Sequence, residues 1–207
     1  MIIRLESNFA AATDPDMTVE RCIDLRCHSS ASPAAVRAIQ VVIRRSASAE
    51  LRMTFRLDGD IPRIHIPMPR VPQFATELWQ HTCFEAFIAV DGEPAYHEFN
   101  FAPSGEWAIY AFRGYRDGGP LADEMMRPRI AVRSTDSRLE LDAAVRLDGL
   151  SAIHPRASLR IGLSAIIEAS DGLSYWALHH PLDKPDFHDA DGFALALDPD
   201  QAELGGA

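Results

Sequence analysis

Basic charge and long apolar runs are what the sequence most lacks. Its 207 residues carry 20 Lys and Arg against 30 Asp and Glu, a net charge of −10. Nucleic acids and anionic membrane surfaces attract proteins with a basic footprint, so we expect neither as a partner. No run approaches the roughly 20 apolar residues of a membrane-spanning helix, and the first residues, MIIRLESNFAAATDPDM, lack a basic segment followed by an apolar one. These absences predict a cytoplasmic protein.

Cysteine and lysine are also scarce. Cys22, Cys27 and Cys83 are odd in number and follow no repeated spacing, which favours free thiols over disulfides or a zinc site. Lys184 is the single lysine beside nineteen arginines. An amine can form a Schiff base, donate to a ligand or ligate iron where a guanidinium cannot, so Lys184 is a candidate site residue. The alternative is a solvated surface lysine.

What the sequence does contain is alternation of period two. Apolar and polar residues alternate over residues 51–57, 139–147 and 159–167, with turn signals between such segments, and no long stretch has helical period. With 47% apolar residues the chain can bury a full core. We therefore predict one all-β domain over residues 1–207, an antiparallel β-sandwich whose core spans about residues 19–198.

A hairpin is predicted around the turn at residues 91–94. Pairing Val90 with Ala95 across this turn sorts the neighbouring side chains onto two faces. The polar face then holds Glu85, Phe87, Tyr96, Glu98 and Asn100, and the core face holds Phe84, Ile88, His97, Phe99 and Phe101.

The next turn, at residues 103–106, leads into a third strand. Pairing Ala102 with Trp107 adds four side chains to the polar face, Trp107, Ile109, Ala111 and Arg113, and assigns Tyr110 and Phe112 to the core. A face with carboxylates, an amide, an indole, a phenol and a guanidinium is typical of a binding surface.

A separate hairpin is predicted around the turn Ser170-Asp171-Gly172. Pairing Ala169 with Leu173 places Trp176 and His180 on the face of Ser164 and Glu168, with Tyr175 and His179 toward the core. Two hairpins thus each set an indole among polar groups. An indole that stacks on a sugar ring, beside groups that bond its hydroxyls, predicts a saccharide site, and the alternative is that each tryptophan closes an end of the sandwich.

Four segments resemble a known group of proteins. LWQHTCFE (78–85), EFNFAPSGEW (98–107), YWALHHP (175–181) and KPDFH (184–188) are similar to DOMON-like domains related to family 9 carbohydrate-binding modules, in their bacterial single-domain branch. The similarity covers roughly residues 20 to 198. It implies an antiparallel β-sandwich that binds a ligand, which is a sugar in some members and haem in others.

The resemblance raises haem and calcium as alternatives. Haem-binding relatives use a methionine with a histidine or lysine as axial ligands, for which Met53, Met68, His180 and Lys184 are the candidates here. No Cys-x-x-Cys-His segment exists for covalent attachment. The Asp- and His-rich residues 179–192 contain donors for calcium or zinc, but their spacing matches no metal motif and favours a polar loop.

Catalysis is the remaining alternative. Glu85 and Glu98 on one face could act as an acid and base, as in glycoside hydrolases, with His180 or His81 as a further base. No nucleophile elbow, phosphate loop or dinucleotide motif is present. We therefore predict a non-catalytic module that binds a small, carbohydrate-like ligand without a cofactor. Its candidate site residues are Trp79, His81, Glu85, Tyr96, Glu98, Asn100, Trp107, Arg113, Glu168, Trp176, His180 and Lys184.

Overall fold

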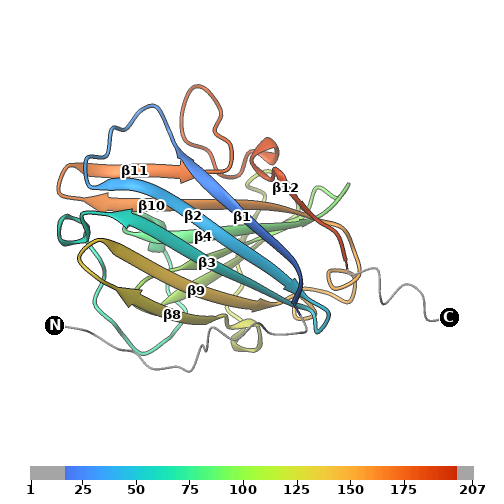
Figure 1. Ribbon diagram of the computed structural model, residues 1–207. Coiled ribbons are helices and arrows are strands. Elements are labelled where there is room, and N and C mark those ends of the chain that lie inside the picture. Colours follow the sequence, from blue (N-terminus) through green and yellow to red (C-terminus); the bar gives the residue numbers. More distant parts are fainter. Residues whose placement is uncertain (1–16, 200–207) are drawn as a thin grey trace.

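The computed structural model describes residues 17–199, which form an antiparallel β-sandwich of two packed layers (Figure 1). The first sheet has the strand order β1 (Met17–Cys27), β2 (Val36–Ser46), β3 (Glu50–Gly59), β9 (Arg138–Arg146) and β8 (Arg129–Ser134). The second has the order β7 (Gly118–Pro120), β6 (Trp107–Phe112), β5 (Tyr96–Phe101), β4 (Cys83–Val90), β10 (Leu159–Ala169) and β11 (Gly172–Ala177), and β12 (Leu195–Leu197) pairs with β10. The predicted all-β sandwich is confirmed.

Strand β1 connects the two sheets. Most of its length pairs with β2, whereas Arg26 and Cys27 at its end pair with β11. The helical segments of the described residues are single turns: η1 (Ile61–Arg63), η2 (Leu78–Gln80), η3 (Glu124–Met126) and η4 (Ala190–Gly192). Within residues 17–199 no helix has the length and apolar character needed to cross a membrane.

Alternating side chains from both sheets fill the space between the layers. Leu51, Met53, Phe55 and Leu57 of β3 point inward, as the alternation predicted. The ring of Phe55 lies 5.1 Å from that of Phe84, on the opposite sheet. The predicted core residues Phe84, Ile88, Phe99 and Phe101 are each at most 1% exposed. This contact between layers is the main apolar core of the domain.

The register of the hairpin β4–β5 is the predicted one. Glu85 pairs with Asn100, and Phe87 pairs with Glu98. The carboxylates of Glu85 and Glu98 consequently lie on the face turned away from the core.

The other two hairpins differ from the prediction by one residue. Trp107 pairs with Phe101 instead of Ala102, because the connection includes Gly105 at φ 90° and is closed by hydrogen bonds between Ser104 and Glu106. At the second, Gly172 at φ 117° pairs with Ala169, so the loop has two residues instead of three. Positive φ favours glycine, and it lets each chain reverse at a different residue than predicted.

A shift of one residue exchanges the two faces of a strand. Trp107 and Trp176, predicted on the polar face, are therefore in the core, and Trp107 packs edge-on against Phe74 at 5.5 Å. The Trp176 indole donates to Ser174 Oγ at 3.0 Å, while the Trp107 indole has no hydrogen-bond partner among the described residues. Three rings predicted to face the core, Tyr110, Phe112 and Tyr175, instead lie on the outer face of the second sheet.

Part of that outer face is covered by the segment after β11. Phe193 stacks on Phe87 of β4 at 5.5 Å and, with Ala89 and Tyr96, forms a second apolar cluster. Gly162 of β10 permits this approach, because a Cβ there would lie 2.7 Å from Phe193 Cδ1. The middle of the second sheet is thus buried on both faces.

The shifted register predicts which tryptophan stabilises the fold. Trp107→Ala should lower the free energy of unfolding by about 3–5 kcal/mol, because it leaves a cavity in the core. Trp79→Ala is the matched control and should cost under about 1 kcal/mol, since Trp79 is 51% exposed. Urea unfolding of the two variants makes the comparison. Equal losses would contradict the burial of Trp107.

Candidate functional site

A cleft of about 580 Å³ lies on the outer face of the second sheet, a size common for small-molecule sites. Its floor comes from β4, β5, β10 and β11, and its sides come from η2, from residues 110–120 and from the loop after β11. The lining residues are Trp79, Glu85, Phe87, Glu98, Tyr110, Phe112, Arg116, Gly118, Gly119, Pro120, Ile166, Tyr175, Pro185, Phe187 and His188.

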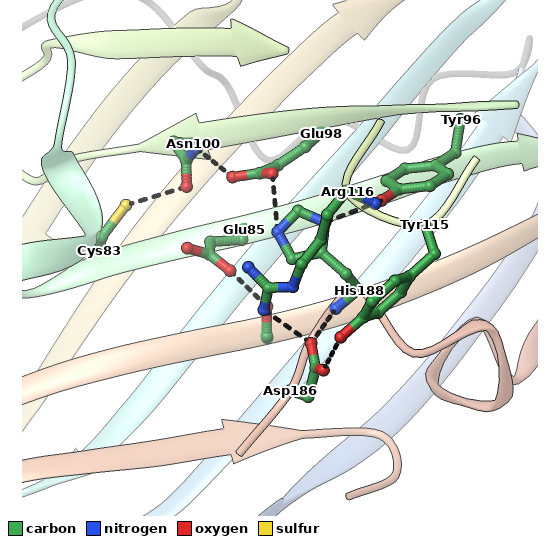
Figure 2. Close-up of polar contacts among 10 residues, drawn as sticks. Cys83, Glu85, Tyr96, Glu98, Asn100, Tyr115, Arg116, Asp186 and His188 are labelled. Carbon is green, nitrogen blue, oxygen red and sulfur yellow. Dashed lines mark hydrogen bonds and ion pairs between the residues drawn. The ribbon is translucent and has the colours of Figure 1, made fainter. Parts of the chain in front are cut away.

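Two buried carboxylates form the polar part of the floor (Figure 2). Glu98 is 6% exposed and accepts a hydrogen bond of 2.7 Å from Asn100 Nδ2. Glu85 is 3% exposed and accepts one of 2.9 Å from Ser164 Oγ. Behind them, the Cys83 thiol donates to Asn100 Oδ1 at 3.7 Å. Each carboxylate therefore keeps acceptor capacity for a molecule in the cleft.

Burial makes these carboxylates hard to ionise. Loss of solvation raises the pKa of Glu98 to about 7, against the opposing effects of Asn100 and Arg116. The pKa of Glu85 is also raised, first by burial and then by the charge of Glu98. Near neutral pH the floor consequently contains proton donors as well as acceptors.

His188 lies directly above Glu98, with its Nε2 3.6 Å from Glu98 Oε2. Tyr96 Oη accepts from the backbone N–H of Arg116 and lies 2.8 Å from His188 Nδ1, so its hydroxyl proton is available to that nitrogen. Nδ1 is thus occupied by Tyr96, and Nε2 is the ring nitrogen that faces Glu98. Burial first, and then the charge of nearby Arg116, lower the pKa of His188 to about 4, so the ring is neutral at pH 7.

Asp186 ties together the two loops that flank the cleft. Its carboxylate accepts from Tyr115 Oη at 2.6 Å and from Arg116 Nη2 at 2.8 Å, and it also accepts from the backbone N–H of His188 at 3.2 Å. Burial alone would raise its pKa, but the bonds from Tyr115 and Arg116 lower it. The ionised Asp186 therefore anchors Arg116 and His188 at the mouth of the cleft (Figure 2).

Aromatic rings form much of the remaining lining. Trp79 of η2, Tyr110 and Phe112 of β6, Tyr175 of β11 and Phe187 all border the cleft and retain solvent exposure. Phe112 is held by stacking on Tyr96 at 4.8 Å. Such rings offer apolar faces to a ligand whose polar groups reach the carboxylates.

The structure brings together five of the predicted site residues at the cleft. Trp79, Glu85 and Glu98 line it, and Tyr96 and Asn100 support it from behind. His81 and Glu168 are also together, with His81 Nδ1 donating to Glu168 Oε2 at 2.8 Å, but they are outside the lining of the cleft.

Five predicted site residues lie elsewhere. Trp107 and Trp176 are core residues. Arg113 is exposed beyond the end of β6 and pairs with Asp117 at 2.8 Å. His180 bonds the backbone oxygen of Arg26, and Lys184 is exposed, with no hydrogen bond or ion pair to the described residues.

Several cleft residues were not among the predicted site residues. Tyr110, Phe112 and Tyr175 were assigned to the core, and correct turn lengths would have placed them on the outer face. Phe187 and His188 also line the cleft. They lie in the KPDFH segment, whose similarity to the DOMON-like group was the signal that could have identified them. Nothing in the sequence near Arg116 indicated its position.

The residues named for haem do not fit the cleft. Met53 is packed in the core between the sheets, and Met68 is an exposed residue of the segment between η1 and η2. Neither of these, nor His180 or Lys184, lines the cleft, so they offer no axial pair there.

The Asp- and His-rich residues 179–192 form a loop, as their spacing indicated. Two of its aspartates are engaged in hydrogen bonds within the protein. Asp186 is bonded to Tyr115 and Arg116, and Asp189 caps η4 by accepting from Asp191 N–H. The described residues do contain three side chains close enough to share a metal ion. They are His65, His81 and Glu168, which lie outside this loop.

Comparison with known proteins relates the chain to another β structure. No family model and no curated protein matches the sequence. A crystal structure of a "putative carbohydrate-binding protein" from Bacteroides uniformis is similar in fold, with a TM-score of 0.56 and 12% identity over 82% of this chain and 81% of that chain. At this identity the similarity supports the fold alone.

The raised pKa of Glu98 predicts how stability changes with pH. Between the ordinary value of 4.5 and about 7, the folded protein retains a proton that the unfolded chain has lost, so stability falls as pH rises through this window. Glu98→Gln removes the effect. The free energy of unfolding is measured with urea at pH 5 and pH 8. From pH 5 to pH 8, the free energy of unfolding of the variant should increase relative to that of the parent by on the order of 3 kcal/mol.

Glu93→Gln is the control, because Glu93 lies exposed in the turn between β4 and β5. Its stability should follow that of the parent at both pH values. Parallel profiles for Glu98→Gln and the parent would show that Glu98 ionises normally.

Proposed function

We propose that the protein binds a small, saccharide-like molecule in this cleft, without covalent chemistry. The observation that carries the proposal is the pair of buried carboxylates that opens into a cleft with aromatic walls. A sugar presents hydroxyl groups on its edge and C–H groups on its faces, and the cleft offers partners for both.

Hydroxyl recognition would rest on Glu85, Glu98 and His188. Ionised carboxylates accept hydrogen bonds, a protonated carboxyl can donate and accept, and His188 offers Nε2, the ring nitrogen that Tyr96 does not occupy. These buried groups lack full solvation, so a ligand that supplies the missing hydrogen bonds is favoured over one that cannot. Arg116, fixed by Asp186, adds a charged donor at the mouth.

Selectivity for neutral ligands follows from the same groups. With negative charge already disfavoured on the floor, a second anionic group placed against Glu85 and Glu98 would be repelled or would have to carry a proton. Half-exposed rings such as Tyr110 and Tyr175 would supply the apolar contact.

Two further observations support the proposal. The fold is similar to that of the Bacteroides uniformis protein, whose name describes carbohydrate binding. The resemblance to DOMON-like domains and family 9 carbohydrate-binding modules includes the strands that carry Glu85, Glu98 and Asn100.

Acid–base catalysis is a second candidate function, favoured by one observation. Glu85 and Glu98 are carboxylates with raised pKa values that face one cleft, and a protonated carboxyl beside a second carboxylate is the usual equipment of a glycosidase. Glu98 would be the acid in that case. Hydrolysis of aryl glycosides by the parent protein, lost in both Glu85→Gln and Glu98→Gln, would establish this function in place of simple binding.

A binding screen tests the primary proposal. Neutral mono- and oligosaccharides, with nucleosides and acidic sugars for comparison, are first ranked by their effect on thermal stability, and binding is then measured by calorimetry. For the best neutral sugar, Glu98→Gln and Tyr110→Ala should each weaken affinity roughly 5- to 100-fold, the loss of one hydrogen bond or stacking contact.

Two neighbouring arginines give a matched control. Arg116→Ala should weaken binding, because it removes a group at the mouth of the cleft, whereas Arg113→Ala should leave affinity unchanged. Saccharide binding that survives Glu98→Gln, Tyr110→Ala and Arg116→Ala would place the site elsewhere. A screen in which no neutral sugar binds would overturn the proposed ligand class.

A further inference from the structure

Three metal-ligand side chains meet on the outer face of the second sheet, outside the cleft. Nδ1 of His65 and Nδ1 of His81 each lie 2.8 Å from Glu168 Oε2, and the donor atoms of all three residues lie within 4.8 Å of one another. The two imidazole rings stand edge to face at 5.9 Å. All three side chains are open to solvent, with exposures of 61%, 56% and 32%.

The backbone holds these three residues in place through Thr82. Thr82 Oγ1 donates to the carbonyl of His65 at 2.7 Å and accepts from the N–H of Glu168 at 3.1 Å, and Thr82 directly follows His81. His65 N–H also donates to the carbonyl of Glu168 at 2.8 Å. Three segments far apart in the sequence are therefore joined at the residues that carry the donors. This framework fixes the backbone positions from which the three side chains extend.

We propose that His65, His81 and Glu168 form a binding site for a divalent transition-metal ion, and zinc is the ion with which to test it. Two imidazole nitrogens and one carboxylate oxygen are a ligand set that zinc uses when it keeps a fourth position open. The set is poor for calcium, which takes six to eight oxygen ligands. This inference goes beyond the proposed function and does not depend on it.

The geometry requires only a small adjustment. Zinc bonds of about 2.0–2.2 Å at tetrahedral angles separate neighbouring donor atoms by roughly 3.3 Å. The Nδ1 atoms now share Glu168 Oε2 through hydrogen bonds, so each must move back by about half an ångström as the metal replaces the two protons. Exposed side chains on a fixed backbone can make such a change by rotating.

The proposed metal position is near one end of the cleft. Glu168 and Ile166 are two residues apart on β10, hence on the same face and about 7 Å from each other along the strand. Ile166 lines the cleft, as does Trp79, two residues before His81. A bound metal would thus be placed beside the cleft without occupying it.

Calorimetry with zinc chloride on protein treated with a chelator tests the site. We expect one equivalent of zinc to bind, and His65→Ala, His81→Ala and Glu168→Gln each to weaken its affinity by at least about tenfold. His179→Ala, the loss of another exposed histidine, is the matched control and should bind zinc as the parent does. The melting temperature should rise with zinc and not with calcium.

Cobalt offers a readout independent of affinity. Cobalt held by this site should give visible absorption that depends on both histidines and disappears when zinc displaces the cobalt. Zinc affinity unchanged in His65→Ala and His81→Ala, or lowered equally by His179→Ala, would overturn the site, and so would the absence of saturable binding. Because His65 and His81 are exposed, their alanine variants carry the test even where Glu168→Gln fails to fold.

Discussion

The bond between Asp186 and Arg116 is the interaction on which the cleft depends. It joins segments separated by 70 residues, and the Tyr115 hydroxyl strengthens it through the other carboxylate oxygen. With Asp186 in place, His188 covers Glu98 and Phe187 borders the cleft. His188 contributes to the burial that raises the pKa of Glu98, and Asp186 holds His188 through its backbone N–H. The chemistry of the floor therefore depends on a contact at the rim.

Two carboxylates on this one sheet face have opposite electrostatics. Burial raises the pKa of Glu98, whereas hydrogen bonds from His65 and His81 lower that of Glu168, which remains open to water. The difference comes from what covers each of them, because both extend from strands of the same sheet. A protonated carboxyl suits hydroxyl recognition, and an ionised one suits a metal. One face can thus hold two sites of different chemistry.

Strand alternation was enough to predict the sandwich and the core residues of β3, β4, β5 and β10, since each run has one consistently apolar side. Turn geometry was the weak step. The register of β4–β5 was right, but Gly105 and Gly172 with positive φ shifted the next two hairpins by one residue. With a period of two, each small error moved an indole from the core to the predicted site. Arg116, His188 and His65 lie in irregular segments, where no periodicity indicates which way a side chain points.

The packing of Phe193 over Gly162 can form only after the C-terminal part of the domain has been synthesised. Strands β4 and β5 leave the ribosome well before β10 and the loop that covers them. Until then, the outer face of this hairpin and one edge of β4 are exposed to solvent. In that state Glu85 and Glu98 are hydrated and ionised. Charges of this kind on an unpaired strand discourage association with other chains. Glu85 and Glu98, which are costly to ionise in the folded protein, would thus reduce aggregation while the chain is still folding.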